Sequence, residues 1–361
     1  MKAGRTLTDL AAEIERQQRA KLDFVAPCRA LEIVPRIVGN VGDPHSVVKD
    51  PLMRVGTKGD FSLRPTAHQQ VATHLGIPWR YWERMTREAP FLLAANANHW
   101  FQQDDSKRMV RTLDNRARAF LSDRYRPLDH ANLAQAVLPA FAEVGVDVVS
   151  CQVTEDRLYL KAVSPRLQGE VKRGDVVQGG VVVSNSETGR GSLRVESLLY
   201  RLICLNGMIA STAIRRTHLG RSTSDGIGDD AREHWTGETH AASDHLLFLQ
   251  VRDVTRGLLT EASFQRHLGK LRGAAEDRIT GNPNDAIETL GMQLNLTQDE
   301  RGSVLRHLIE GGDLSRYGVS QAVTRAAQDV ESYDRATELE AAGWQVIELP
   351  RNAWQTVAGA R

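Results

Sequence analysis

Arginine and aromatic residues occur together in two segments of this chain. The first, residues 107–126, holds seven basic residues against Asp114 and Asp123, a local net charge of +5. The second, residues 190–221, holds six arginines against Glu196, again +5, although the whole chain carries only +1. Guanidinium groups bind phosphate in a bidentate manner and stack on bases. The two segments therefore predict a nucleic-acid partner, bound through local patches and not through overall charge.

Within these segments, alternation along a strand would place Arg116 and Arg118 on one face, beside Phe120 and Tyr125. The alternative is that Asp114, Asp123 and Asp129 neutralise these arginines and that Phe120 belongs to the core. Arg201 lies inside an apolar run, so it either extends to solvent or has a partner. The predicted nucleic-acid-binding residues are Arg108, Arg111, Arg116, Arg118, Arg124, Tyr125, Arg126, Arg201, Arg215, Arg216, His218 and Arg221.

Asn206-Gly207 is the strongest short turn signal of the chain. It directly follows the apolar run 198–205, most of which we expect in the core. Glycine adopts positive φ without steric cost, so we predict a tight turn with Gly207 in that conformation.

The sequence contains no clear motif for nucleotide binding, thiol chemistry or metal binding. Phosphate-loop motifs are absent, and the glycines at 179–180 and 189–191 are typical of turns or bulges. The three cysteines, Cys28, Cys151 and Cys204, are far apart, as expected for reduced and mostly buried thiols. His234, His240 and His245, with nearby carboxylates such as Asp229 and Asp244, offer ligands for a divalent metal, but their spacing fits no known motif. We therefore expect no cofactor, no metal and no hydrolytic activity. A metal-dependent nuclease built on residues 225–245 is the alternative.

The composition is that of a soluble globular protein, with 41% hydrophobic and 25% charged residues. The sequence has no apolar run near 18 residues, so we expect no membrane span. Residues 7–21 have the apolar spacing of an amphipathic helix, and Pro35 places the strand 31–38 at a sheet edge. Hairpins are predicted at 52–63, 109–122 around Asp114-Asn115, and 146–163.

The hydrophobic spacing of the other segments predicts further helices and strands. Thr66 is predicted to cap a helix ending at Gly76, and Pro78 and Pro90 to begin the next two helices. The second of these three helices carries Trp79, Tyr81 and Trp82, which cannot all face one core. An exposed one could stack on a base or pack on another subunit. Strands are predicted at 176–184 and 193–204, and a capping box at Thr297. Residues 344–349 suggest one terminal strand.

These elements predict an α+β fold of antiparallel hairpins packed with helices, followed by a mainly helical C-terminal region. The expected units are an N-terminal helix and edge strand (1–50), an α+β core (51–222), a polar loop (223–240) and the helical region (241–361).

Several segments together resemble a known family. They are LGIPWRYWERM (75–85), LLAANANHWF (92–101), VRTLDNRARAFLSDRYRPLDH (110–130), RLICLNGMI (201–209) and RRTHLGR (215–221). In this order they resemble the phage/plasmid-like family of domain of unknown function 932. The resemblance implies a mobile genetic element and residence in the cytoplasm, but no reaction and no catalytic residue.

The combined expectation is a cytoplasmic accessory protein of a phage or plasmid. We expect it to bind single-stranded or partly unwound DNA, to act in strand annealing or recombination, and to form a homo-oligomer. A protein-interaction module of a mobile element is a further alternative.

Overall fold

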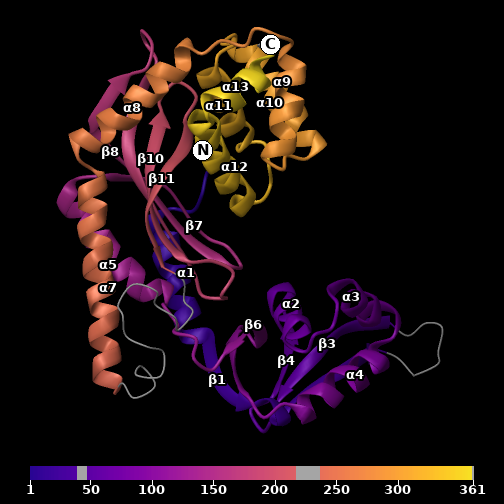
Figure 1. The fold of residues 1–361 in the computed structure, drawn as a ribbon. Coiled ribbons are helices and arrows are strands. Elements are labelled where there is room, and N and C mark those ends of the chain that lie inside the picture. The colour runs from indigo at the N-terminus through magenta and orange to yellow at the C-terminus, as the bar shows by residue number, and fades with distance from the viewer. Residues whose placement is uncertain (39–46, 217–235, 360–361) are drawn as a thin grey trace.

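The computed structural model describes residues 1–38, 47–216 and 236–359. In this part of the chain the strands form two β-sheets. Figure 1 shows the N-terminal sheet with α2, α3 and α4 in the lower part of the molecule and the second sheet with the C-terminal helices in the upper part. The strands are β1 Lys21–Pro27, β2 Leu31–Val38, β3 Val47–Val55, β4 Asp60–Leu63, β5 Lys107–Leu113, β6 Arg116–Ser122, β7 Asp147–Val153, β8 Arg157–Glu170, β9 Val176–Ser186, β10 Leu193–Arg201 and β11 Asn206–Arg216. The α+β class and the helical C-terminal region are as predicted. No described helix has the length and apolarity needed to cross a membrane.

The N-terminal sheet has the described order β1-β5-β6-β4-β3-β2, and all its pairs are antiparallel except β4 with β6. Helices α2 (Pro65–His74), α3 (Trp79–Glu88) and α4 (Pro90–Gln103) bury one face of it, against side chains such as Ile33, Met53 and Phe61. As predicted, β2 is an edge strand, and its pairing shifts register across Pro35. The β5–β6 hairpin also confirms its predicted turn, because Asp114 and Asn115 both have positive φ.

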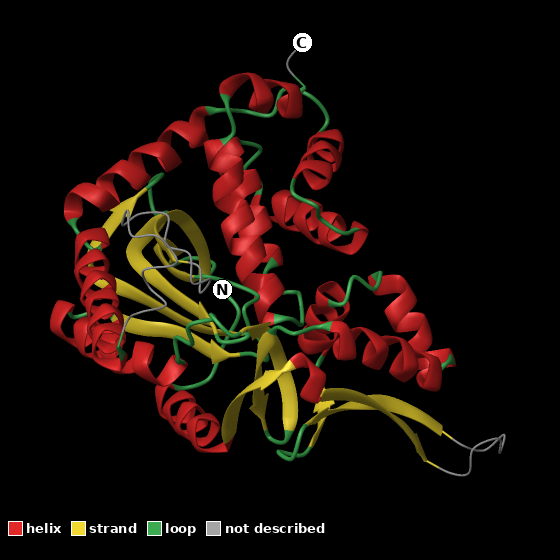
Figure 2. Cartoon of the chain, turned by 60° about the horizontal axis from the view of Figure 1, so that its bottom comes forward, coloured by secondary structure: helices red, strands yellow, loops and turns green. Residues whose placement is uncertain are grey.

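The second sheet is an antiparallel meander in the order β11-β10-β9-β8-β7. Alternate side chains point to opposite faces, so Leu160 and Val183 pack against α1 (Leu7–Ala20), α5 (His130–Val144) and α7 (Gly237–Leu258). Val163 and Val182 point to the other face, beside α12 (Tyr333–Glu348). Both faces of this sheet are therefore covered, and Figure 2 shows helices around it.

The C-terminal helices have a core of their own and also pack on the second sheet. They are α8 Glu261–Glu276, α9 Pro283–Gln293, α10 Gln298–Gly311, α11 Arg316–Ala326, α12 and α13 Arg351–Ala358. The capping box of Thr297 and Glu300 is present at the start of α10, as predicted. The terminal strand predicted at 344–349 is wrong: these residues form the end of α12, where Trp344 and Val346 are buried.

Two further local predictions are corrected. Arg64, not Thr66, is the N-cap of α2, because Pro65 takes the first helical position and the Thr66 hydroxyl donates to Asp156 of the second sheet. The turn between β10 and β11 precedes Asn206, and its positive φ of 51° falls on Leu205. Gly207 has an ordinary φ and lies within β11, where a Cβ would approach Leu198 Cδ1 at 3.2 Å. A side chain here would need Leu198 and Met1 to shift by a few tenths of an ångström, so glycine is favoured by close packing and not by φ.

A buried ion pair joins α12 to the second sheet. Lys161 of β8 and Glu340 of α12 are both fully buried, and Lys161 Nζ donates to Glu340 Oε2 at 2.6 Å. The same Nζ lies 4.6 Å from the centre of the Tyr333 ring. Each charge depends on the other for solvation, because no water reaches either of them.

We therefore expect Glu340→Leu and Lys161→Met to lower the free energy of unfolding by about 3–5 kcal/mol each. The double variant should lose much less than the sum, because no unpaired charge is left in the interior. Urea unfolding measures these differences. The exposed pair Lys270–Glu348 is the control, and Lys270→Met should cost less than about 1 kcal/mol. A double variant as unstable as the summed singles would contradict this interpretation.

Candidate functional site

Two of the arginines predicted to bind nucleic acid lie in the interior. Arg111 is fully buried, and its guanidinium donates to Asp23 (2.9 Å), to Asp129 (2.9 Å) and to the carbonyl of Glu187 (2.9 Å). Arg118 is 4% exposed and donates to Glu187 Oε2 at 2.5 Å. Neither guanidinium can reach a ligand at the surface, so the predicted ridge formed by Arg116 and Arg118 does not exist.

A β-bulge explains the position of Arg118. Strand β5 pairs Arg111 with Ala119 and Thr112 with Ala117, so Arg118 is the extra residue of β6. A bulge redirects the side chain at the extra position. Here it separates Arg118 from the exposed Arg116 and points it toward the second sheet.

Glu187 connects the two sheets. It directly follows β9, is 4% exposed, and accepts from Arg118 through Oε2 and from the His130 backbone N–H through Oε1 (2.6 Å). Burial alone would raise the pKa of this carboxyl, but the interactions with His130, Arg118 and Arg111 outweigh it and lower the pKa to about 2. Glu187 is therefore ionised at neutral pH.

His130 is held neutral beside this carboxylate. Burial lowers the pKa of its imidazole to about 4, and Nδ1 lies 3.2 Å from the Asn185 amide nitrogen. Since the amide nitrogen can only donate, Nδ1 is the acceptor and Nε2 carries the proton. Each charge of the Arg111–Arg118–Glu187 network, the "junction network", is thus compensated by protein groups, which is the arrangement of a structural joint.

The other predicted residues are divided among several environments. Tyr125 is 5% exposed and belongs to the interior, whereas Arg116, Arg124 and Arg215 are exposed. Arg126 lies 4.0 Å from Asp244 of α7. Arg215 is in register with Arg194 on the neighbouring strand. Arg194 also lies 3.9 Å from Glu196, so its charge is partly compensated.

Two predicted arginines contact partners elsewhere. Arg108 donates to His74 Nδ1 at 2.7 Å, and Arg201 binds Asp175 with both nitrogens at 2.6 and 2.8 Å. His218, Arg221 and the side chain of Arg216 lie outside the described residues. Most of the alternative metal loop also does, including His234 and the side chain of His240.

The helical layer on the N-terminal sheet exposes aromatic side chains. Tyr81 belongs to the group of Trp79, Tyr81 and Trp82 noted in the sequence, whereas Phe91 and Trp100 were not selected from it. Tyr81 of α3 is 43% exposed, and Phe91, Leu92 and Trp100 of α4 are between 48% and 52% exposed. Trp82, in contrast, is 1% exposed and donates to His68. The available signal was that α4 carries large apolar residues on more than one face, since Leu93 and Phe101 are buried.

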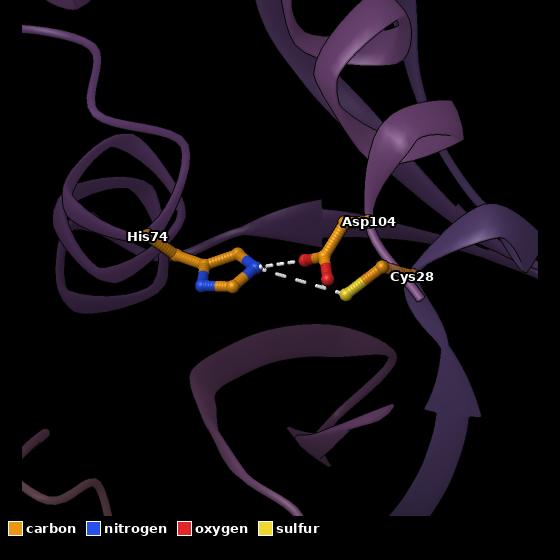
Figure 3. Close-up of side chains that lie close together, drawn as sticks. All are labelled: Cys28, His74 and Asp104. Atoms are coloured by element: carbon orange, nitrogen blue, oxygen red, sulfur yellow. Dashed lines mark hydrogen bonds and ion pairs between the residues drawn. The ribbon is translucent and has the colours of Figure 1, made fainter. Parts of the chain in front are cut away.

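Cys28, His74 and Asp104 meet at a partly buried point between β1, α2 and the end of α4, where their side chains converge (Figure 3). His74 Nε2 lies 2.6 Å from Asp104 Oδ2 and 3.7 Å from Cys28 Sγ. These are donor atoms that zinc accepts. A zinc ion on Nε2 would need Nδ1 to carry the imidazole proton.

Arg108 prevents that arrangement. Its guanidinium can only donate, so the 2.7 Å contact places the lone pair on Nδ1 and the proton on Nε2, which donates to Asp104. Burial also raises the pKa of the Cys28 thiol to about 11, which opposes the thiolate that zinc requires. The cluster is therefore best described as a hydrogen-bonded thiol–imidazole–carboxylate group without a metal.

Comparison with known proteins finds a family-model match to part of the chain. Residues 118–254, less than half of the chain, match the model described as a domain of unknown function, DUF932. This match covers most of β6, α5, the whole second sheet and most of α7. Over these residues it confirms the resemblance expected from the sequence. No curated protein and no solved structure matches significantly.

The buried histidines predict acid instability. Burial lowers the pKa of both His68 and His130 to about 4, below the unfolded value of about 6.5. The unfolded chain therefore binds protons first, and stability is lost as the pH falls from about 6.5 to 4. Glu187 adds a loss of the same sign from about 4.5 downwards, because its folded pKa is also lowered.

We expect the free energy of unfolding to fall by about 1.4 kcal/mol per pH unit for each buried histidine in that window. Urea unfolding between pH 7 and pH 4 measures this slope. His130→Asn should flatten the profile, whereas the same substitution at the exposed His99 should leave it unchanged. An equal slope in the wild type and the His130 variant would show that His130 is not buried neutral.

Cobalt tests the assignment of the thiol cluster. We expect no thiolate-to-cobalt absorption band on titration of the wild type with Co²⁺. Arg108→Gln frees Nδ1 to carry the proton and should bind Co²⁺ more tightly than the wild type. A band in the wild type that disappears with Cys28→Ser would establish a metal site and overturn the argument from Arg108.

Proposed function

We propose that this protein binds single-stranded or partly unwound nucleic acid through the outer surface of α3 and α4. The supporting observation is the exposure of Tyr81, Phe91, Leu92 and Trp100 on this layer, the "aromatic surface". Aromatic rings accept stacked bases of any sequence, and each stacked base contributes about 1–3 kcal/mol. We expected stacking on Phe120, on Tyr125 or on the group of Trp79, Tyr81 and Trp82. Phe120, Tyr125 and Trp82 are buried, so this surface provides the stacking through Tyr81 and the aromatic residues of α4.

Cations accompany the aromatic surface. Residues 64–103 contain four arginines and two glutamates, a net charge of +2. Arg80 and Arg87 of α3 are exposed and have no ion-pair partner among the described residues, whereas Arg84 pairs with Glu88 at 2.8 Å. Arginine–phosphate contacts release counterions and make binding depend on salt. Bases on the rings and phosphates on these arginines would together hold a single strand.

Further arginines, in β6, in β11 and in the segment after β6, extend this proposal. Arg116, Arg124, Arg126 and Arg215 remain candidates for phosphate contacts, and Arg111 and Arg118 do not, because they are needed inside. Strand annealing, recombination and assembly as a homo-oligomer in the cytoplasm are the finer parts of the proposal. They rest on the family resemblance alone.

A protein partner is the second candidate for the same surface. Helix α4 contains no Asp, Glu, Lys or Arg from Pro90 to Gln103. An exposed apolar helix face without charge is typical of a protein interface. A second copy of this chain is one such partner, and the experiment below separates the two candidates.

Fluorescence anisotropy with a labelled oligothymidylate measures the binding. Trp100→Ala and Tyr81→Ala should each weaken it by about 5- to 100-fold, the equivalent of one lost stacked base. Arg87→Gln should weaken it less and reduce the salt slope by about 0.7. Leu246→Ala on α7, 56% exposed, is the matched control and should bind like the wild type. Chelator should change neither the binding nor the integrity of the DNA.

Unchanged binding in Trp100→Ala and Tyr81→Ala, with an intact fold, would remove the aromatic surface from the proposal. A change of the mass in solution in Trp100→Ala, without a change in DNA binding, would assign the surface to a protein partner. Cleavage of the DNA in magnesium or manganese would favour the nuclease alternative.

A further inference from the structure

A pocket of about 200 Å³ lies where the β10–β11 turn meets α10 and α11. Its wall includes Arg201, Cys204, Asn206, Tyr317, Gln321 and Arg325. Three of these residues belong to the RLICLNG segment that carries the family resemblance. Neither the junction network nor the aromatic surface uses this pocket.

Most charges around the pocket are already compensated. Arg201 binds Asp175, to which the Tyr317 hydroxyl also donates at 3.0 Å. Asp313 pairs with Lys172 and Arg278, and His307 with Glu310 and Asp329. Arg325 differs, because it has no carboxylate partner among the described residues. Its guanidinium donates to the Cys204 carbonyl at 3.3 Å.

Asn206 provides an unsatisfied acceptor in the same wall. Its amide nitrogen donates to Gln321 Oε1 at 2.8 Å and to Thr324 Oγ1 at 2.5 Å. Thr324 donates its own proton to the Gln321 carbonyl, so its oxygen must accept, which fixes the amide orientation. Asn206 Oδ1 is thereby left buried without a hydrogen-bond partner among the described residues. Such a group costs free energy unless a donor meets it.

We propose that this pocket binds a small molecule that joins an anionic group, carboxylate or phosphate, to an N–H or O–H donor. The anion would pair with Arg325. The donor would pair with Asn206 Oδ1 after the side chains that cover this oxygen move aside, because the oxygen itself is buried. Gln321, which holds the Asn206 amide, and Arg325 are four residues apart on α11, so their Cβ atoms lie about 5–6 Å apart. A ligand of this kind therefore carries a short spacer between its two groups.

Occupation of the pocket would couple two parts of the molecule. Asn206 and Cys204 belong to the second sheet, and Arg325 belongs to the C-terminal helices. A ligand that contacts both should stabilise their packing, and its effect on stability is independent of DNA binding.

Thermal unfolding of the full chain tests this with phosphoethanolamine and β-alanine, which carry a phosphate and a carboxylate on the same two-carbon amine. At ~100 times its dissociation constant, a binding probe should raise Tm by about 3 °C or more. Inorganic phosphate and ethanolamine each supply only one of the two groups, so their shifts should be smaller. The shifts produced by the two double probes, phosphoethanolamine and β-alanine, compared with each other, show whether the site prefers phosphate or carboxylate.

Arg325→Gln should abolish the shift, and Arg325→Lys should restore part of it. Arg351→Gln, an exposed arginine of α13, is the matched control and should respond like the wild type. The proposal fails if neither double probe shifts Tm, or if the shift is the same in Arg325→Gln. Equal shifts with inorganic phosphate alone would overturn the role of Asn206 and indicate an anion site only.

Discussion

The carboxylate of Glu187 is the contact on which the arrangement of the two sheets depends. It lies just after β9 of the second sheet and accepts from Arg118 of the first, while its backbone carbonyl accepts from Arg111. The network contains a second positive charge, on Arg111, and Asp23 and Asp129 compensate it. A buried network of this kind is favourable only when every member has its partner. The geometry of β1, β5, β6 and the β9–β10 turn is therefore specified together and not piece by piece.

A second buried ion pair, Lys161–Glu340, fixes the position of α12 on the second sheet. The DUF932 segment thus lies between two polar joints, one toward the N-terminal sheet and one toward the C-terminal helices. Exposed aromatic residues are left on the helical layer of the N-terminal sheet and belong to neither joint. The opposite, buried face of that layer supplies its contacts with the core.

Local patterns predicted local structure well. Asp114-Asn115 identified a hairpin because both residues tolerate positive φ, and Thr297 with Glu300 identified a helix start because the two side chains cap each other. The failures have tertiary causes. The segment 344–349 is rich in strand-forming residues, yet it is helical, because Trp344 and Ile347 fill a site beside α8. Thr66 does not cap its helix because its hydroxyl is used by Asp156 of the other sheet.

The candidate site shows the same difference between local structure, which the sequence predicts, and tertiary contacts, which it does not. A local count of charge makes residues 107–126 strongly basic, but the count omits Asp23, Asp129 and Glu187, which come from outside the segment and neutralise Arg111 and Arg118. The sequence indicated Asp129 as a partner, but no spacing rule could identify Asp23 and Glu187, because a single β-bulge decides that Arg118 points inward. The aromatic surface was hard to predict for the opposite reason. Its residues are of types that are usually buried. Only the packing of α4 shows which of them lie in the core and which are exposed. In this chain Arg111 and Arg118 build the fold, so the proposed nucleic-acid binding rests on the side chains that the fold leaves exposed.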